Sequence, residues 1–219
     1  MPVNTKYIES FSENQFYHIY CKAVGNNVLF KSEQNKSYFL KKYADYSAGY
    51  FDTYAYCLLG NHVHWLIKCP SNENLISHLN SAEKDHLKNH QKKFLNNEIN
   101  FDEALEYQLK DFFISYSLAF NKMYNRSGSL FINPFRRVLV KDDAHFTQLI
   151  IYIHANTLKH GVYANFQHYK WSSYQSILST SSTLIKRNEV IEWFGNKEQF
   201  IKAHIEAGKF YNENLYSIE

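Results

Sequence analysis

Hydrophobic and polar residues alternate early in the chain as they do in a half-buried strand. Residues 15–24 place Phe16 and His18 on one side and Tyr17 and Ile19 on the other, which predicts a strand. A Lys- and Tyr-rich segment from about 33 to 46 predicts a helix. Apolar runs on both sides of Gly60-Asn61 predict a tight antiparallel hairpin. The expected opening order is therefore strand, helix, strand, strand.

The rest of the chain is expected to be mainly helical. Residues 74–96 indicate one helix with charged faces, and another is expected from Asp102 or Asp111 to Tyr124. Residues 130–140 predict a short, irregular strand pair interrupted at Asn133-Pro134.

Three further helical segments are expected towards the C-terminus. Asp142 or Asp143 caps a helix that reaches about His160 and stops at Gly161. The stretch 171–174 is interpreted as a capped helix start packed by its tryptophan, and residues 188–211 predict two short helices.

The pair His62-Val63-His64 is the clearest candidate for chemistry. Side chains alternate faces along a strand, so both histidines project from the same side of the sheet and could share one metal ion. Two satisfied polar residues at a strand start are the alternative reading. A zinc site that also used Cys57 and Cys69 is disfavoured, because Cys69 has the opposite parity to the histidines.

A second candidate lies on the helix expected at 142–160. Its apolar stripe of Phe146, Leu149, Ile150 and Ile153 would pack on the sheet. Gln148, Tyr152 and Asn156 recur four residues apart on the flank of that stripe. This flank could bring a phenol nucleophile and an amide oxygen to a metal site on the sheet, although an ordinary amphipathic-helix tyrosine gives the same spacing.

Composition adds a hint about partners. Aromatic residues make up 17% of the chain, the net charge is only +3, and the three cysteines are too few for a disulfide framework. With no apolar leader and no membrane-length stretch, a soluble cytoplasmic protein is expected. Residues 121–141 are basic and aromatic with no acidic side chain, which favours contact with phosphates through Lys122, Arg126, Arg136, Arg137 and Lys141.

Four segments together resemble the single-tyrosine HUH transposases, in particular those associated with repetitive extragenic palindromes (REP). These are residues 56–66 with the run Gly60-Asn61-His62-Val63-His64, residues 120–131, residues 152–156 and residues 171–174. Their order and approximate spacing span most of the chain. The first segment alone is moderately specific, and the four together are strong.

The resemblance implies an α+β fold with a ferredoxin-like antiparallel sheet, helices on one face, a helical insertion and C-terminal helices. It assigns Tyr152 as the nucleophile and His62, His64 and Asn156 as ligands of Mg²⁺ or Mn²⁺. The implied activity is nicking and strand transfer of single-stranded or hairpin DNA through a 5′-phosphotyrosine. The expected layout is a catalytic domain at 1–180, with an insertion at about 71–125, and an extension at 181–219.

The chain also departs from the family's usual pattern. Family members commonly continue the catalytic helix with Asn-Pro and an Arg-Ala-Gly run, whereas residues 156–161 read Asn-Thr-Leu-Lys-His-Gly. Gly60 stands where a proline is usual before Asn61, and residues 132–137, Ile-Asn-Pro-Phe-Arg-Arg, stand where the family tends to have a Gln-Gly step followed by Arg-Phe. A non-catalytic hairpin-binding relative is the main rival interpretation, and a metal hydrolase of small substrates is a weaker one. Both a homodimer and a monomer agree with the pattern.

Overall fold

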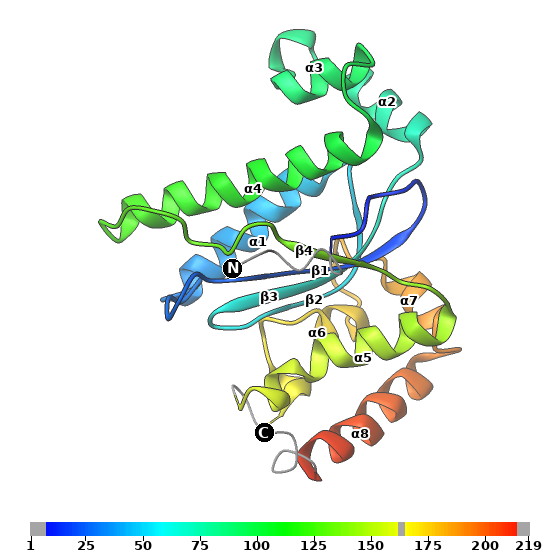
Figure 1. Cartoon of the computed structure of the whole chain (residues 1–219). Helices are drawn as coiled ribbons and strands as arrows, with labels where there is room; N and C mark the ends of the chain where they lie inside the picture. The colour runs from blue at the N-terminus through cyan, green and yellow to red at the C-terminus, as the bar shows by residue number, and fades with distance from the viewer. Residues whose placement is uncertain (1–7, 162–164, 214–219) are drawn as a thin grey trace.

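The computed structural model describes residues 8–161 and 165–213, which build one four-stranded antiparallel sheet and the helices around it (Figure 1). The strands are β1 (Phe16–Lys22), β2 (Asp52–Leu58), β3 (His62–Lys68) and β4 (Arg136–Leu139). Their spatial order is β2-β3-β1-β4. The predicted hairpin is therefore confirmed, with β2 and β3 paired on either side of the turn at residues 59–61.

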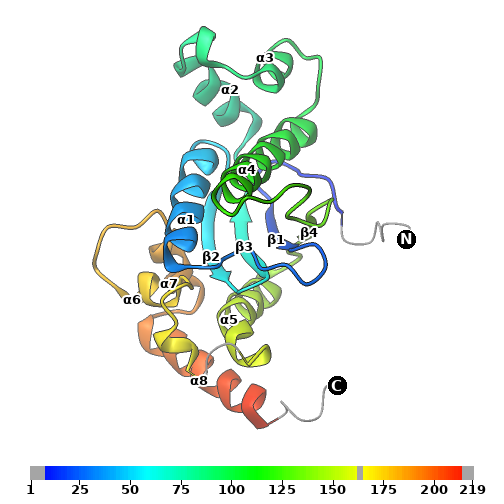
Figure 2. The same cartoon turned by 90° about the vertical axis from the view of Figure 1, so that its left-hand side faces the viewer.

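Helices cover both faces of the sheet (Figures 1 and 2). Helices α1 (Glu33–Ser47) and α4 (Phe101–Met123) lie together on one face, and α5 (Asp143–Lys159) lies on the other. The succession β1-α1-β2-β3-α4-β4, with α1 and α4 on one face, is the ferredoxin-like arrangement. The predicted α+β class is confirmed, and α5 with the helices after it forms a third layer.

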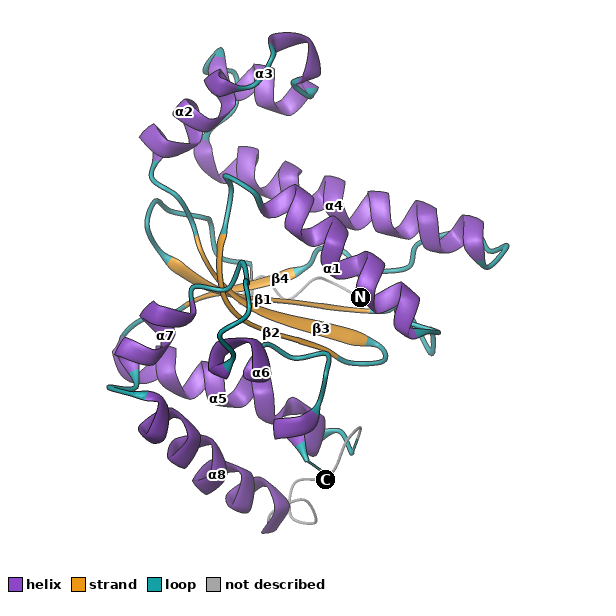
Figure 3. Ribbon diagram, turned by 180° about the vertical axis from the view of Figure 1, so that it is seen from behind, coloured by secondary structure: helices purple, strands orange, loops and turns teal. Residues whose placement is uncertain are grey.

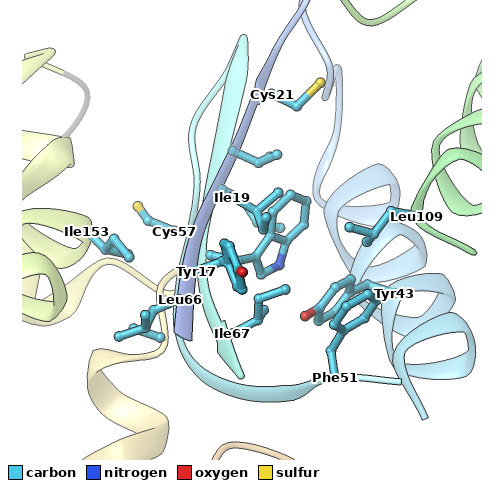
Figure 4. Packing of buried hydrophobic residues seen from close by; sticks show 14 of the residues in the cluster. Tyr17, Ile19, Cys21, Tyr43, Phe51, Cys57, Leu66, Ile67, Leu109 and Ile153 are labelled. Carbon is cyan, nitrogen blue, oxygen red and sulfur yellow. The ribbon is translucent and has the colours of Figure 1, made fainter. Parts of the chain in front are cut away.

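Alternation along the strands gives each face its own core. On the α1/α4 face, Trp65 of β3 stacks against Tyr43 and Phe39 of α1, with ring centroids 5.1 and 5.6 Å away. On the opposite face, Cys57 and Leu66 point towards α5 and its Ile153 (Figure 4). Because both faces are buried, a register slip of one residue would exchange the two side-chain sets, so the register is strongly fixed.

The helical insertion is smaller and more broken than predicted. Residues 74–96 form α2 (Asn72–Ser81), a 3₁₀ turn (Lys84–His86) and α3 (Asn89–Leu95), which stand away from the sheet (Figure 3). Helix α4, assigned to the insertion by sequence, packs against α1 and belongs to the core. The expected strand pair at 130–140 is one short strand, β4, preceded by an isolated bridge between Ala23 and Phe131.

Helix α5 begins and ends where its capping residues predict. Asp142 is the N-cap, and its side chain accepts from the backbone N–H of His145 at 2.8 Å. Gly161 follows the helix with φ of +59°, a conformation that few other residues adopt readily. All four residues of the predicted apolar stripe are buried.

The C-terminal helices continue the layer that α5 begins. They are α6 (Tyr174–Leu178), α7 (Arg187–Trp193) and α8 (Lys197–Glu213), and α8 packs along α5. The stretch 171–174 does lead into a helix, but the N-cap Ser173 makes no side-chain cap hydrogen bond. No helix in the described part of the chain is long and apolar enough to cross a membrane.

A buried hydrogen-bond chain joins α8 to α5 and to the sheet. The Phe200 carbonyl accepts from Nδ1 of His204 at 2.7 Å, which leaves Nε2 of His204 to accept from Nδ1 of His154 at 2.9 Å. Nε2 of His154 then accepts from the Ser173 hydroxyl at 2.8 Å, and Ser173 Oγ accepts from the Tyr56 backbone N–H at 2.9 Å. Every step has one donor and one acceptor, so both imidazoles are neutral and satisfied. Burial accordingly lowers the pKa of His204 to about 4.

Candidate functional site

Both motif histidines project from the sheet face that α5 covers. In the register, His62 pairs with Lys22 and His64 pairs with Tyr20, so these side chains share one face, as strand alternation predicts. A cavity of about 320 Å³ lies here between the sheet, the residues before β4 and the end of α5. It is lined by Tyr20, Cys21, Lys22, His62, His64, Ile132, Pro134, Arg136, Tyr152, Lys159 and His160.

The Nδ1 atom of each motif histidine forms a hydrogen bond with a neighbouring side chain. Nδ1 of His62 lies 2.7 Å from Oδ1 of Asn61, which can only accept, so this nitrogen carries the proton. Nδ1 of His64 shares a hydrogen bond of 2.9 Å with Nε2 of His18. When His64 is the donor in that bond, Nε2 of both motif histidines holds a lone pair. The two rings lie 5.1 Å apart, nearly perpendicular to each other.

Both imidazoles are neutral at pH 7. Burial lowers the pKa of His62 to about 4, and the charges of His160 and Lys22 act in the same direction. Burial, followed by the neighbouring histidines and Lys159, holds the pKa of His64 well below its usual range. Neutral imidazole is the form that binds metal ions.

Tyr152 reaches the site from α5. Its ring stands edge-on to His64, with centroids 5.8 Å apart and an interplanar angle of 90°, and it is edge-on to His18 at 6.0 Å. The Lys159 ammonium lies 5.3 Å from the centre of the Tyr152 ring. The helix therefore brings the predicted nucleophile onto the histidine face, as its position beside the apolar stripe predicts.

Asn156 lies one turn beyond Tyr152 and is fully buried. Its Nδ2 donates to the Tyr152 carbonyl at 2.8 Å, whereas its Oδ1 has no hydrogen-bond partner among the described residues. A buried oxygen without a partner costs free energy unless something else binds it. An amide oxygen is of the type that binds Mg²⁺ and Mn²⁺, but Asn156 is not among the residues that line the histidine cavity.

The site contains one more candidate donor that the sequence did not suggest. His160, just beyond α5, lies with its ring 4.6 Å from that of His62. In the described residues no three His, Cys, Asp or Glu side chains already converge to hold a metal ion. A centre here would therefore use the Asn156 oxygen, or would need the exposed His160 side chain to turn. The cysteine alternative gains nothing, since Cys57 and Cys69 are buried thiols.

The two neighbouring arginines of β4 face opposite sides of the sheet. Arg136 pairs with Tyr20 and lines the cavity. Arg137 points towards α4, where its side chain is only 4% exposed and lies 2.9 Å from Glu106 and 3.4 Å from Asp102. The prediction that Arg137 contacts DNA is therefore corrected: it is an internal ion-pair partner.

The other predicted basic residues are dispersed. Lys122 is exposed near the end of α4, and Arg126 donates to Asn121 and to the Ser129 carbonyl, which holds the turn after α4. Lys141 is exposed beyond β4, at the end of the sheet away from His62. Lys22 and Lys159, which sequence reasoning missed, line the cavity instead. Lys22 could have been found from its parity with His18 and Tyr20 in β1.

A larger groove of about 630 Å³ lies between α4 and residues 128–135. It shares Pro134 with the histidine cavity, but it contains none of the predicted site residues. The histidine cavity is therefore the better candidate site.

Comparison with known proteins agrees with this architecture. No protein-family model matches the chain, and no curated protein matches its sequence. Among solved structures, the chain is similar to a REP-associated tyrosine transposase bound to a REP hairpin. The match has a TM-score of 0.57 and 9% sequence identity, and it covers 81% of this chain and 92% of the other. The chain therefore has the fold of a REP-associated tyrosine transposase.

Proposed function

We propose that this protein is a metal-dependent transposase that nicks and rejoins single-stranded DNA at hairpin-type sites. One observation carries the proposal: Tyr152 stands edge-on to His64 in a cavity that both motif histidines line. The fold supports the same class, because a protein that shares it is a transposase bound to a hairpin.

The reaction that fits these residues is a phosphoryl transfer. The Tyr152 oxygen attacks the phosphorus atom and gives up its proton, while the bond from phosphorus to the 3′ oxygen breaks and that oxygen takes up a proton as a hydroxyl. The Lys159 ammonium lies over the Tyr152 ring and also lines the cavity, where it adds positive charge beside the position of the phosphate. The 5′-phosphotyrosine keeps the bond energy, so a second 3′-hydroxyl can reverse the step without a nucleotide cofactor.

The predicted ligands of the divalent ion are His62, His64 and Asn156. Bound by them, Mg²⁺ or Mn²⁺ would supply positive charge to the scissile phosphate. Both histidines are neutral, and the Nδ1 proton of His62 is held by Asn61, so His62 can bind through Nε2 without a rearrangement of protons. The Asn156 oxygen has no competing partner among the described residues.

Asn156 and His160 can be compared directly as third ligands. We expect Asn156→Ala to weaken Mn²⁺ binding by about tenfold or more, since it removes the orphaned oxygen. His160→Ala should lower the affinity for Mn²⁺ less than Asn156→Ala does, because the His160 side chain is exposed. Calorimetric titration of both variants with Mn²⁺ measures the difference. A larger loss in His160→Ala would assign the third position to His160.

Arg136 and Arg137 offer a matched test of the DNA contact. Arg136→Gln should lower the slope of log affinity against log salt by roughly 0.7, because one phosphate contact on a single strand is lost. Arg137→Gln should leave that slope unchanged and destabilise the fold by about 2–4 kcal/mol, since Asp102 and Glu106 lose their cation.

Salt-dependent binding of a labelled hairpin and thermal unfolding measure these two effects. An unchanged slope for Arg136→Gln would exclude its phosphate contact. A lower slope for a folded Arg137→Gln would contradict the internal role of that residue.

The rival function is hairpin binding without cleavage. A labelled library of single-stranded hairpins, incubated with the protein and Mn²⁺, separates the two. We expect a covalent protein–DNA species that resists denaturation. Tight binding with no such species would favour the non-catalytic binder.

A further inference from the structure

His18 is the histidine of the site to which the proposed chemistry gives no role. It lies on β1, on the same sheet face as Tyr20 and diagonally across from His64. Its Nε2 atom is 2.9 Å from Nδ1 of His64. Its ring also stands edge-on to Tyr152, with centroids 6.0 Å apart. One side chain therefore touches both a predicted ligand and the predicted nucleophile.

We propose that His18 is a positioning residue that sets the tautomer and the orientation of His64 for metal binding. The inference rests on the proposed function, because it has meaning only if His64 binds the ion. His18 accepts the Nδ1 proton of His64 through its own Nε2 and keeps its proton on Nδ1. That arrangement leaves the His64 lone pair on Nε2.

The surrounding rings restrict how His64 can turn. The His18 ring lies edge to edge with that of His64, with centroids 5.1 Å apart and planes 20° apart, and the Tyr20 ring is nearly parallel to that of His64 at 5.7 Å and 19°. These neighbours restrict the plane of the His64 ring, but a half-turn about its Cβ–Cγ bond would keep that plane and exchange each ring nitrogen for a carbon. The hydrogen bond to His18 removes this freedom, because only one of the two orientations brings Nδ1 to Nε2 of His18.

The arrangement matches that of His62. Asn61 accepts the Nδ1 proton of His62 at 2.7 Å, as His18 does for His64. Partners that hold the second nitrogen of a ligating histidine contribute about 10–100-fold to metal affinity. A turn residue, Asn61, and a residue of β1, His18, would thus give both motif histidines the same tautomer.

The test compares His18→Gln with His18→Asn. The amide oxygen of glutamine reaches approximately the position of Nε2 and can accept from His64, whereas that of asparagine is one carbon too short. Both substitutions introduce the same amide group, so they differ mainly in reach. We expect His18→Asn to weaken Mn²⁺ binding by about 10–100-fold and His18→Gln to restore most of it.

Calorimetric titration with Mn²⁺ alone gives the affinity, and the visible absorption of bound Co²⁺ reports the ligand geometry. Thermal unfolding and metal-free hairpin binding control for folding. Wild-type affinity in a folded His18→Asn protein would overturn the proposal, and so would equal losses in both variants, which indicate packing alone.

Failure of the proposed function would look different. Undiminished Mn²⁺ binding in both His62→Ala and His64→Ala would show that these histidines do not bind the ion. The role of His18 would then be overturned as well. A site lost in those variants but intact in His18→Asn would overturn only the positioning role.

Discussion

Tyr152→Phe should bind hairpin DNA as the unmodified protein does and form no covalent adduct, with cleavage reduced by roughly 10⁴-fold or more. The substitution removes the attacking oxygen and keeps the ring that packs edge-on to His64 and His18. Hairpin binding and adduct formation, measured on the same labelled DNA, separate the two properties.

Tyr20→Phe is the matched control, because Tyr20 lines the same cavity and stacks on His64. It should retain the adduct. The hydroxyls of Tyr116 and Tyr124 donate to the Leu29 carbonyl and to Asn35 Oδ1, both at 2.6 Å, so they are engaged elsewhere. Tyr163, a competitor by sequence, lies outside the described residues. Peptide mapping of an adduct to Tyr20 would contradict the assignment of Tyr152.

His62→Ala and His64→Ala should each abolish divalent-dependent cleavage and weaken Mn²⁺ binding by more than about tenfold. Their effects on stability should differ. His62 is half-buried at the head of β3, so its loss should leave the fold largely intact. His64 is 5% exposed and packs beside the rings of His18 and Tyr20, so its removal also leaves a small cavity.

Thermal unfolding separates the loss of the ion from the loss of the fold. His86→Ala is a suitable control, because that side chain is 78% exposed and lies outside the site. Full cleavage by both motif variants in the presence of Mn²⁺ would refute the metal role. Collapse of the fold in His62→Ala would favour the structural interpretation of the pair.

Sequence patterns predicted the sheet and α5 well because both have a clear period and a clear boundary. Strand β1 alternates, β2 and β3 are apolar runs on either side of Gly60-Asn61, and α5 has an N-cap aspartate and a terminal glycine. The break within residues 74–96 carries no such signal. Helix α2 buries Leu75 and Leu79, whereas α3 buries His90 and Phe94, so the segment has no continuous apolar stripe to hold one straight helix.

Parity and helical spacing placed three predicted residues together at the site. Parity set His62 beside His64, and the apolar stripe of α5 set Tyr152 against that face. The same rule would have separated Arg136 from Arg137, but no clear alternation marked β4. His18 and His160 could not be placed, because their contacts depend on the pairing of β1 with β3 and on where α5 ends over the sheet.

The buried hydrogen-bond chain through His154 makes the C-terminal region part of the framework that holds α5. His154 lies two residues after Tyr152 on α5, and the Phe200 carbonyl of α8 sets the direction of its proton through His204. The described part of the C-terminal extension, residues 181–213, is therefore not an interchangeable appendage. In a chimera that replaced this extension with a foreign segment, the buried imidazole of His154 would lose its hydrogen-bond partner His204. His154 lies on α5, the helix that carries Tyr152. Helix α5 and the C-terminal extension are therefore best transferred between proteins together.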